Sequence, residues 1–127
     1  MEEIYKLLKE APSLFKSVTM TDENEIAITT GWMCDEQAEL VLYVTQTDDN
    51  LILTDKGQMR TYMDKVFELS EPDVIKNIIA VTDYYGISTK NKQLSLELCE
   101  NEEGFTEGFL KMLYCIGFLD AMKIFYV

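Results

Sequence analysis

Residues 48–58, DDNLILTDKGQ, hold three aspartates and one lysine around a short apolar run. Carboxylates beside a lysine are the groups that metal-dependent nucleases use, but the same residues also form turns, strands and helix caps. In the structural interpretation, residues 48–50 form a turn and residues 51–54 form a short strand. Asp55 then caps a helix, and Gly57 relieves the tight strand-to-helix turn. The segment is therefore predicted to join a sheet to a helix.

Two further strands are predicted before this turn, because apolar side chains alternate in residues 25–33 and 39–46. The short loops between these strands favour an antiparallel meander. After the third strand the apolar spacing becomes that of a helix, over about residues 57–68. The sequence SEPD at 70–73 has the form of a capping box. It predicts a second helix, which ends at Gly86.

Both ends of the chain are also predicted to be helical. Residues 2–11 repeat apolar side chains at helical spacing, and residues 105–127 are apolar, with Gly117 as a candidate break. A strand at 94–98 follows a small hairpin at 89–92. We therefore expect a single domain of 127 residues with an α+β fold, in which an antiparallel β-meander packs against helices. If unbroken, the apolar C-terminal helix lies in the core or at a surface for self-association.

The composition excludes several classes of function. The 127 residues include 23 acidic residues, 11 basic residues and no histidine, which gives a net charge of −12. So acidic a chain is poorly suited to bind the phosphate backbone of nucleic acids or an acidic lipid surface. The three cysteines lie far apart and do not predict a zinc site. We expect reduced thiols, no membrane span and a cytoplasmic location.

The order of these elements resembles a known family. The stretches LILTDKGQMRTYM, YYGI, LSLEL and EGFLKMLYCIGFLDAM follow the pattern of the bacterial and phage family catalogued as domain of unknown function 1828. The recurring core of that family is an apolar strand that runs into Leu-Thr-Asp-x-Gly, followed by a helix; Leu53, Thr54, Asp55 and Gly57 match this core. The resemblance implies an origin in bacteria, their prophages or mobile elements, and it implies no activity.

The enzymatic alternative is a metal-dependent phosphodiesterase or nuclease that uses Asp48, Asp49 and Asp55. In such a site Lys56 would steady a phosphate. Restriction-type nucleases also need Glu-x-Lys on a neighbouring strand, whereas the strand LSLELCE offers Glu97 without that lysine. No histidine is present to activate a serine or cysteine, and no glycine-rich loop could hold a phosphate. The sequence thus favours a non-enzymatic protein with no cofactor and no bound metal.

The acidic residues are unevenly distributed, because residues 17–55 contain nine of them and no lysine or arginine. In a meander, the acids at 22–25 would lie beside the turn at 48–49, and those at 35–39 would mark the other end of the sheet. A solubilising surface and a cation site between the turns are alternatives. We predict instead a surface for a basic protein, such as a nuclease or DNA-binding protein that the chain would inhibit, in the extreme case as a DNA mimic. Eight residues form the predicted surface: Asp22, Glu23, Glu25, Asp35, Glu36, Glu39, Asp48 and Asp49.

Overall fold

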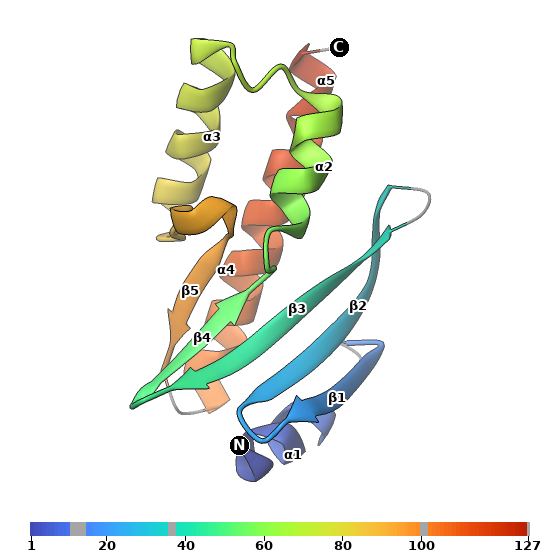
Figure 1. Ribbon diagram of the computed structural model, residues 1–127, viewed down its shortest axis with the longest axis vertical. Coiled ribbons are helices and arrows are strands. Elements are labelled where there is room, and N and C mark those ends of the chain that lie inside the picture. Colours follow the sequence, from blue (N-terminus) through green and yellow to red (C-terminus); the bar gives the residue numbers. More distant parts are fainter. Residues whose placement is uncertain (11–14, 36–37, 100–101, 127) are drawn as a thin grey trace.

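The chain has an α+β fold, as predicted, with one five-stranded antiparallel sheet and helices packed against it (Figure 1). The computed structural model describes residues 1–10, 15–35, 38–99 and 102–126. The strands occur in the sheet in chain order: β1 (Ser17–Asp22), β2 (Glu25–Asp35), β3 (Ala38–Thr47), β4 (Asn50–Thr54) and β5 (Ser95–Leu98). The helical elements are α1 (Glu2–Glu10), α2 (Gln58–Val66), α3 (Pro72–Tyr84), the 3-10 turn η1 (Lys90–Lys92), α4 (Glu102–Ala121) and α5 (Lys123–Tyr126).

One face of the sheet is a continuous apolar surface. The register places Met20, Ile26, Val44, Leu53 and Leu96 in one row that crosses all five strands. Residues directly opposite each other in an antiparallel pair point to the same face of the sheet. The three central residues of this row are fully buried, and the two at the edges are half-buried. Leu53, at the start of the LTDKG stretch, is therefore part of the centre of the core.

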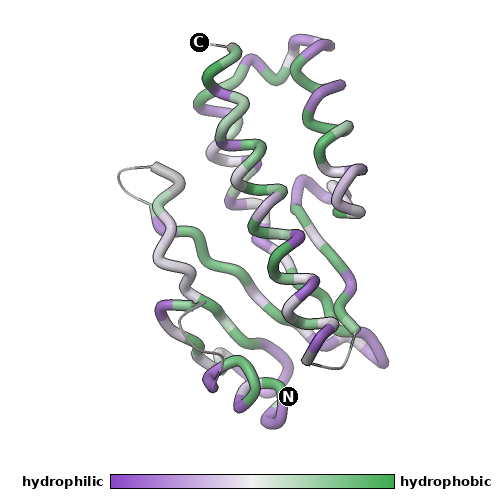
Figure 2. Tube along the Cα trace, turned by 180° about the vertical axis from the view of Figure 1, so that it is seen from behind, coloured by the Kyte–Doolittle hydropathy of each residue, from purple (hydrophilic) through white to green (hydrophobic). Residues whose placement is uncertain are grey.

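Helix α4 covers this apolar face (Figure 2) and packs against β5 and α3. Its Phe109, Met112 and Leu119 side chains are buried in the core. At Gly108 the helix comes so close to the sheet that a Cβ atom would lie 2.3 Å from Cδ2 of Leu98. A side chain at position 108 would therefore displace a buried leucine, and the absence of one sets the distance between helix and sheet.

Two local predictions differ from the structure. Strand β1 is missing from the sequence-based prediction, because Val18 and Met20 give it only two apolar inward positions at the edge of the sheet. The capping box at Ser70 is wrong, since the N-cap of α3 is Glu71 and no side chain caps it. Pro72 is the first helical residue, and its fixed φ favours a helix start at this position. The predicted helix end at Gly86 is confirmed, because α3 ends two residues before it.

The C-terminal helix α4 runs through Gly117 without a break, so the alternative that places it in the core is confirmed. The polar residues that interrupt its apolar pattern have a structural role. The Tyr62 hydroxyl of α2 donates a hydrogen bond to Asp120 at 2.6 Å, and Lys123 lies 3.3 Å from the same carboxylate oxygen. Burial, and secondarily the bond to Asp120, raises the pKa of Tyr62. This cluster fastens α2 to the end of α4.

The close approach at Gly108 leads to a prediction about helix packing. We expect Gly108→Ala to lower the free energy of unfolding by about 1–3 kcal/mol, because the new methyl group must displace Leu98. Gly117→Ala is the matched control, since its Cβ would lie 3.7 Å from Trp32, an ordinary contact. Alanine also favours the helix by up to about 1 kcal/mol over glycine. Urea unfolding measures both variants, and equal stabilities would contradict the close contact at Gly108.

Candidate functional site

Asp55 is a buried carboxylate whose side chain is fully engaged by the backbone, with 1% of the residue exposed. Its Oδ1 accepts the N–H groups of Gly57 at 2.8 Å and Leu94 at 3.0 Å, and Oδ2 accepts the N–H of Met59 at 2.9 Å. The Asp55 N–H donates in return to the Leu94 carbonyl at 3.2 Å. The predicted N-cap position is wrong by two residues, because Gly57 is the N-cap of α2, but Asp55 still accepts the N–H of Met59 in the first turn of the helix. The same carboxylate also holds the chain that leads into β5.

The residues around Asp55 shape the turn from β4 into α2. Thr54 Oγ1 accepts the Lys56 N–H at 3.1 Å, which closes the turn over the aspartate. Lys56 and Gly57 both have positive φ, at 53° and 86°. A Cβ at Gly57 would lie 3.1 Å from the Lys92 carbonyl oxygen, so both conformation and space favour glycine here. The LTDKG stretch is thus a joint between three parts of the chain.

Two partners of this joint are not identified by the sequence analysis. The Gln58 side-chain amide accepts the Val41 N–H at 3.0 Å and donates to the Glu39 carbonyl at 2.6 Å, which fastens α2 to β3. A polar residue at the start of an amphipathic helix is ordinarily predicted to face solvent. Leu94 bonds to Asp55 through its backbone, and a backbone group leaves no signal in the sequence.

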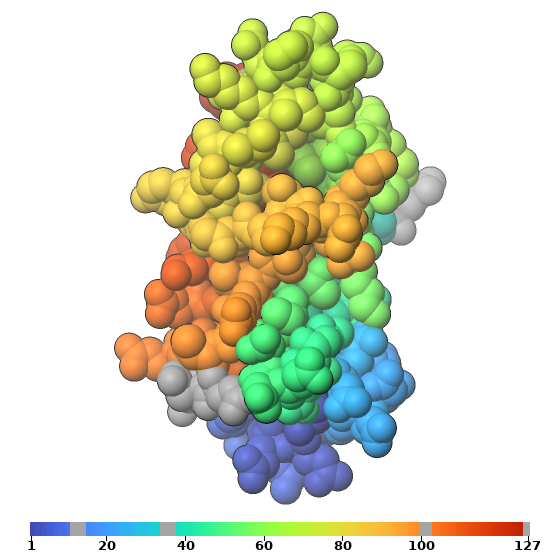
Figure 3. Space-filling view, turned by 60° about the vertical axis from the view of Figure 1, so that its left-hand side comes forward, coloured from blue at the N-terminus to red at the C-terminus, as the bar shows by residue number. Residues whose placement is uncertain are grey.

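The β1–β2 and β3–β4 turns lie side by side at one end of the sheet, as the sequence predicts. Glu25 pairs with Thr45 in the register, and the Gln46 N–H donates to the Asn24 carbonyl at 2.9 Å. Figure 3 shows the two turns next to each other, with α1 below them. These turns carry four exposed carboxylates, which we call the turn acids: Asp22, Glu23, Asp48 and Asp49.

The other described members of the predicted acidic surface are paired with lysines. Glu25 forms an ion pair with Lys56, whose ammonium also lies 4.1 Å from the centre of the Tyr43 ring. Glu39 lies 3.7 Å from Lys16. Two further predicted positions lie outside the described residues: Glu36 and the side chain of Asp35. The structure therefore gathers four of the eight predicted residues at one end and compensates two others within the fold.

The aspartates of the enzymatic alternative lie apart. Asp48 and Asp49 precede β4 and Asp55 follows it, and five extended residues span about 17 Å. The Asp55 carboxylate is also buried and engaged by backbone N–H groups. In the described part of the chain, no group of three or more acidic or cysteine side chains is placed to hold a metal ion. Asp48, Asp49 and Asp55 therefore do not form one metal site in this structure.

The described cysteines differ in exposure. Cys115 is fully buried in α4, and Cys99 after β5 is exposed. Burial, together with the negative charge of Asp55, raises the pKa of the Cys115 thiol to about 12. Cys115 is therefore a neutral core residue at physiological pH and is poorly suited to act as a nucleophile.

Several exposed apolar side chains belong to α3, α4 and α5: Tyr84, Tyr114, Phe118, Ile124 and Phe125. Exposed apolar residues on the C-terminal helices are compatible with self-association, which stays a prediction. Among the described residues, no helix combines the length and the apolar character that a membrane crossing requires.

Comparison with known proteins gives no match: no family model, no curated protein and no solved structure resembles the chain closely enough to be matched to it. The resemblance to domain of unknown function 1828 therefore stays a prediction. Any function has to be argued from the residues and their geometry.

The bonds around Asp55 lead to a prediction about stability. We expect Asp55→Ala to lower the free energy of unfolding by about 3 kcal/mol or more, because two buried N–H groups and one partly buried N–H group lose their acceptor. Asp49→Ala removes an exposed carboxylate from the turn at the other end of β4 and should change stability by less than about 0.5 kcal/mol. Urea unfolding compares the two variants. A stable Asp55→Ala protein that loses a Mg²⁺-dependent nuclease activity would instead support the enzymatic alternative.

The two thiols lead to a prediction about reactivity. Iodoacetamide at pH 8 should label Cys99 rapidly and leave Cys115 unmodified, because Cys115 is buried and its thiol ionises only near pH 12. Peptide mass spectrometry reads each site separately. In concentrated urea both should react, which shows that the protection comes from the fold. Equal labelling of the two cysteines in the native protein would contradict the buried position of Cys115.

Proposed function

We propose that the protein is a non-enzymatic binding module whose turn acids dock onto a basic surface of another protein. One observation carries this proposal: the four turn acids lie together, and no described lysine or arginine forms a salt bridge with them. Glu25 and Glu39, by contrast, are compensated by lysines within the fold. Uncompensated carboxylates that lie close together repel one another, and a basic partner would relieve that repulsion.

The distribution of charge over the molecule supports the proposal. Helix α2 with Arg60 and the turn η1 with Lys92 lie beyond the opposite end of β4 from the turn acids (Figure 1), whereas the charge of Lys56 is already paired with Glu25. Helix α1 lies near the turn acids and carries two lysines and three glutamates, so the local net charge at this end of the sheet stays negative. A basic protein that approaches would therefore be attracted to the turn end first, and its association rate would depend on ionic strength.

The partner that suits such a surface is a nuclease or another protein that binds nucleic acid. Proteins of this kind present lysines and arginines to the phosphate backbone, and exposed carboxylates can occupy the same groups. In this proposal the chain acts in the cytoplasm, in a bacterial or mobile-element setting, as a regulator or inhibitor of its partner. Its strongest form is competition with DNA for the same basic surface.

The proposal leads to a prediction about binding. A fourfold variant that converts the turn acids to Asn or Gln should lose capture of basic proteins from a bacterial lysate. The unchanged chain should retain them at about 50 mM salt and release them at about 500 mM, because salt screens exposed charges. Captured proteins are identified by mass spectrometry, and each candidate is then purified and titrated by calorimetry with the unchanged chain and with the variant.

A control variant with the same change in net charge makes the test specific. It carries Gln or Asn at four exposed acids that lie in α3 or between α2 and α3: Glu68, Glu71, Asp73 and Asp83. Affinity for the purified partner should persist in this control and fall at least tenfold in the turn variant. If both variants lose binding equally, attraction follows net charge and the proposed surface is wrong. If both variants bind the purified basic partner as tightly as the unchanged chain does, the proposed function is wrong.

A further inference from the structure

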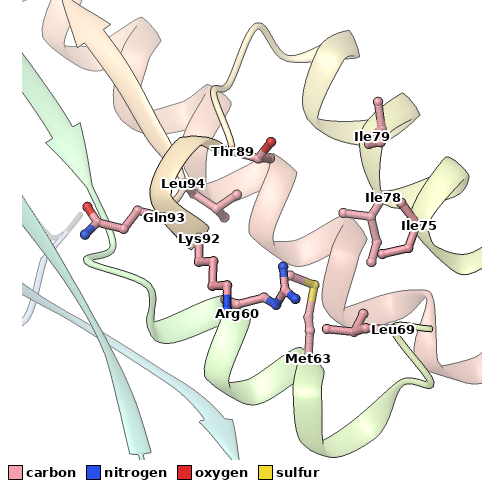
Figure 4. A pocket seen from close by; sticks show the side chains of 10 residues that line it. All are labelled: Arg60, Met63, Leu69, Ile75, Ile78, Ile79, Thr89, Lys92, Gln93 and Leu94. Atoms are coloured by element: carbon pink, nitrogen blue, oxygen red, sulfur yellow. The ribbon is translucent and has the colours of Figure 1, made fainter.

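A second candidate site lies away from the turn acids, between α2, α3 and the segment around η1. It is an open pocket of about 220 Å³ (Figure 4). Three buried side chains form its floor: Met63 of α2, Ile78 of α3 and Leu94, which precedes β5. Ile75 and Ile79 of α3 continue the apolar wall toward the mouth. Each of the three contributing segments thus supplies apolar surface to one cavity.

Two cationic side chains line the same pocket. Figure 4 shows Arg60 and Lys92 on one side of it, across from the isoleucines of α3. In the described chain, Arg60 uses its Nε to contact Asp64 at 3.4 Å, and its remaining guanidinium donors have no partner. Lys92 likewise has no ion pair with a described residue. The described residues that line this pocket include no carboxylate, although acids outnumber bases by 23 to 11 in the chain.

This combination specifies the chemistry of a ligand. An apolar floor favours a hydrocarbon body, and guanidinium and ammonium donors at one wall favour an anionic group. An engineered apolar cavity of about 150 Å³ holds benzene, so this somewhat larger pocket fits a ring with a few further carbons. Thr89 adds a hydroxyl at the mouth. An anion is also the ligand that local charge would attract here, whereas a cation would be attracted to the turn end.

We propose that this pocket binds a small organic carboxylate with an apolar body about the size of a phenyl ring and a short alkyl chain. The carboxylate contacts Arg60 and Lys92, and the ring packs against Met63, Ile78 and Leu94. The site lies at the opposite end of β4 from the turn acids, so it does not depend on the function proposed for them. A chain that binds both would respond to a metabolite at one end and contact a protein at the other.

The test uses 4-phenylbutyrate as the probe and isothermal titration calorimetry as the readout, with ¹H–¹⁵N NMR shifts to locate binding. The neutral 4-phenylbutyramide should bind about tenfold more weakly, since it lacks the charge that the two cations contact. Acetate, which lacks the ring, should not bind measurably. Arg60→Gln and Lys92→Gln should each weaken binding of 4-phenylbutyrate by about fivefold to tenfold. Both side chains are at the surface, so these variants should fold.

Lys76→Gln is the matched control, because Lys76 is an exposed lysine of α3 that does not line the pocket. Its affinity for 4-phenylbutyrate should equal that of the unchanged chain. The proposal is overturned if the amide binds as tightly as the acid, or if Lys76→Gln weakens binding as much as the pocket variants. It is also overturned if the shifts fall outside α2, α3 and η1. If N-acetyl-glycyl-phenylalanine binds and 4-phenylbutyrate does not, the pocket is assigned instead to the C-terminal carboxylate of a peptide.

Discussion

The Asp55 carboxylate, with its three backbone N–H donors, is the interaction on which the other described features depend. The donors belong to Gly57, Met59 and Leu94, so one side chain joins the end of β4, the start of α2 and the entry to β5. A buried carboxylate is stable only when its oxygens are hydrogen-bonded, and here the backbone supplies all three bonds. The strand β4 and the helix α2 consequently meet at a fixed angle, and β5 is held beside β4.

The position of the apolar pocket follows from this joint. Leu94 is held by Asp55, and the Lys92 carbonyl lies against Gly57, so η1 is placed beside the first turns of α2. Arg60 is one helical turn beyond Gly57 and therefore reaches the same wall as Lys92. Two cations that are 32 positions apart in the chain become neighbours because a buried aspartate fixes the backbone between them.

The sheet divides the acidic residues into two kinds. Glu25 and Glu39 lie along strands, where lysines from neighbouring segments reach them. Glu23, Asp48 and Asp49 lie on the two hairpin turns and Asp22 is the last residue of β1, so these carboxylates are exposed where the chain reverses, and the two turns are adjacent. The charge left uncompensated by the fold is thus concentrated at one end of the sheet. Meander topology, more than the number of acids, determines where that charge is concentrated.

The sequence by itself determined the fold class, most element positions and the nearness of the two acidic turns. Alternation with period two identifies β2, β3 and β4, and an antiparallel meander leaves little freedom for the place of their turns. The same reasoning missed β1, whose edge position gives it few inward apolar residues, and misplaced the cap of α3, where Pro72 sets the helix start. It assigned Asp55 to a cap because aspartate commonly has that role before a helix.

Tertiary structure alone decided which acids are compensated, where Gln58 bonds, and that Arg60 and Lys92 line one pocket. These contacts join residues distant in the chain, and several of them use backbone groups that are the same in every residue. Periodicity records the face on which a side chain lies, but it does not record which segment packs against that face. The pattern of apolar and acidic residues in the sequence could therefore predict a sheet with acidic turns at one end. The pocket at the opposite end of β4 depends on how the helices pack, which that pattern does not record.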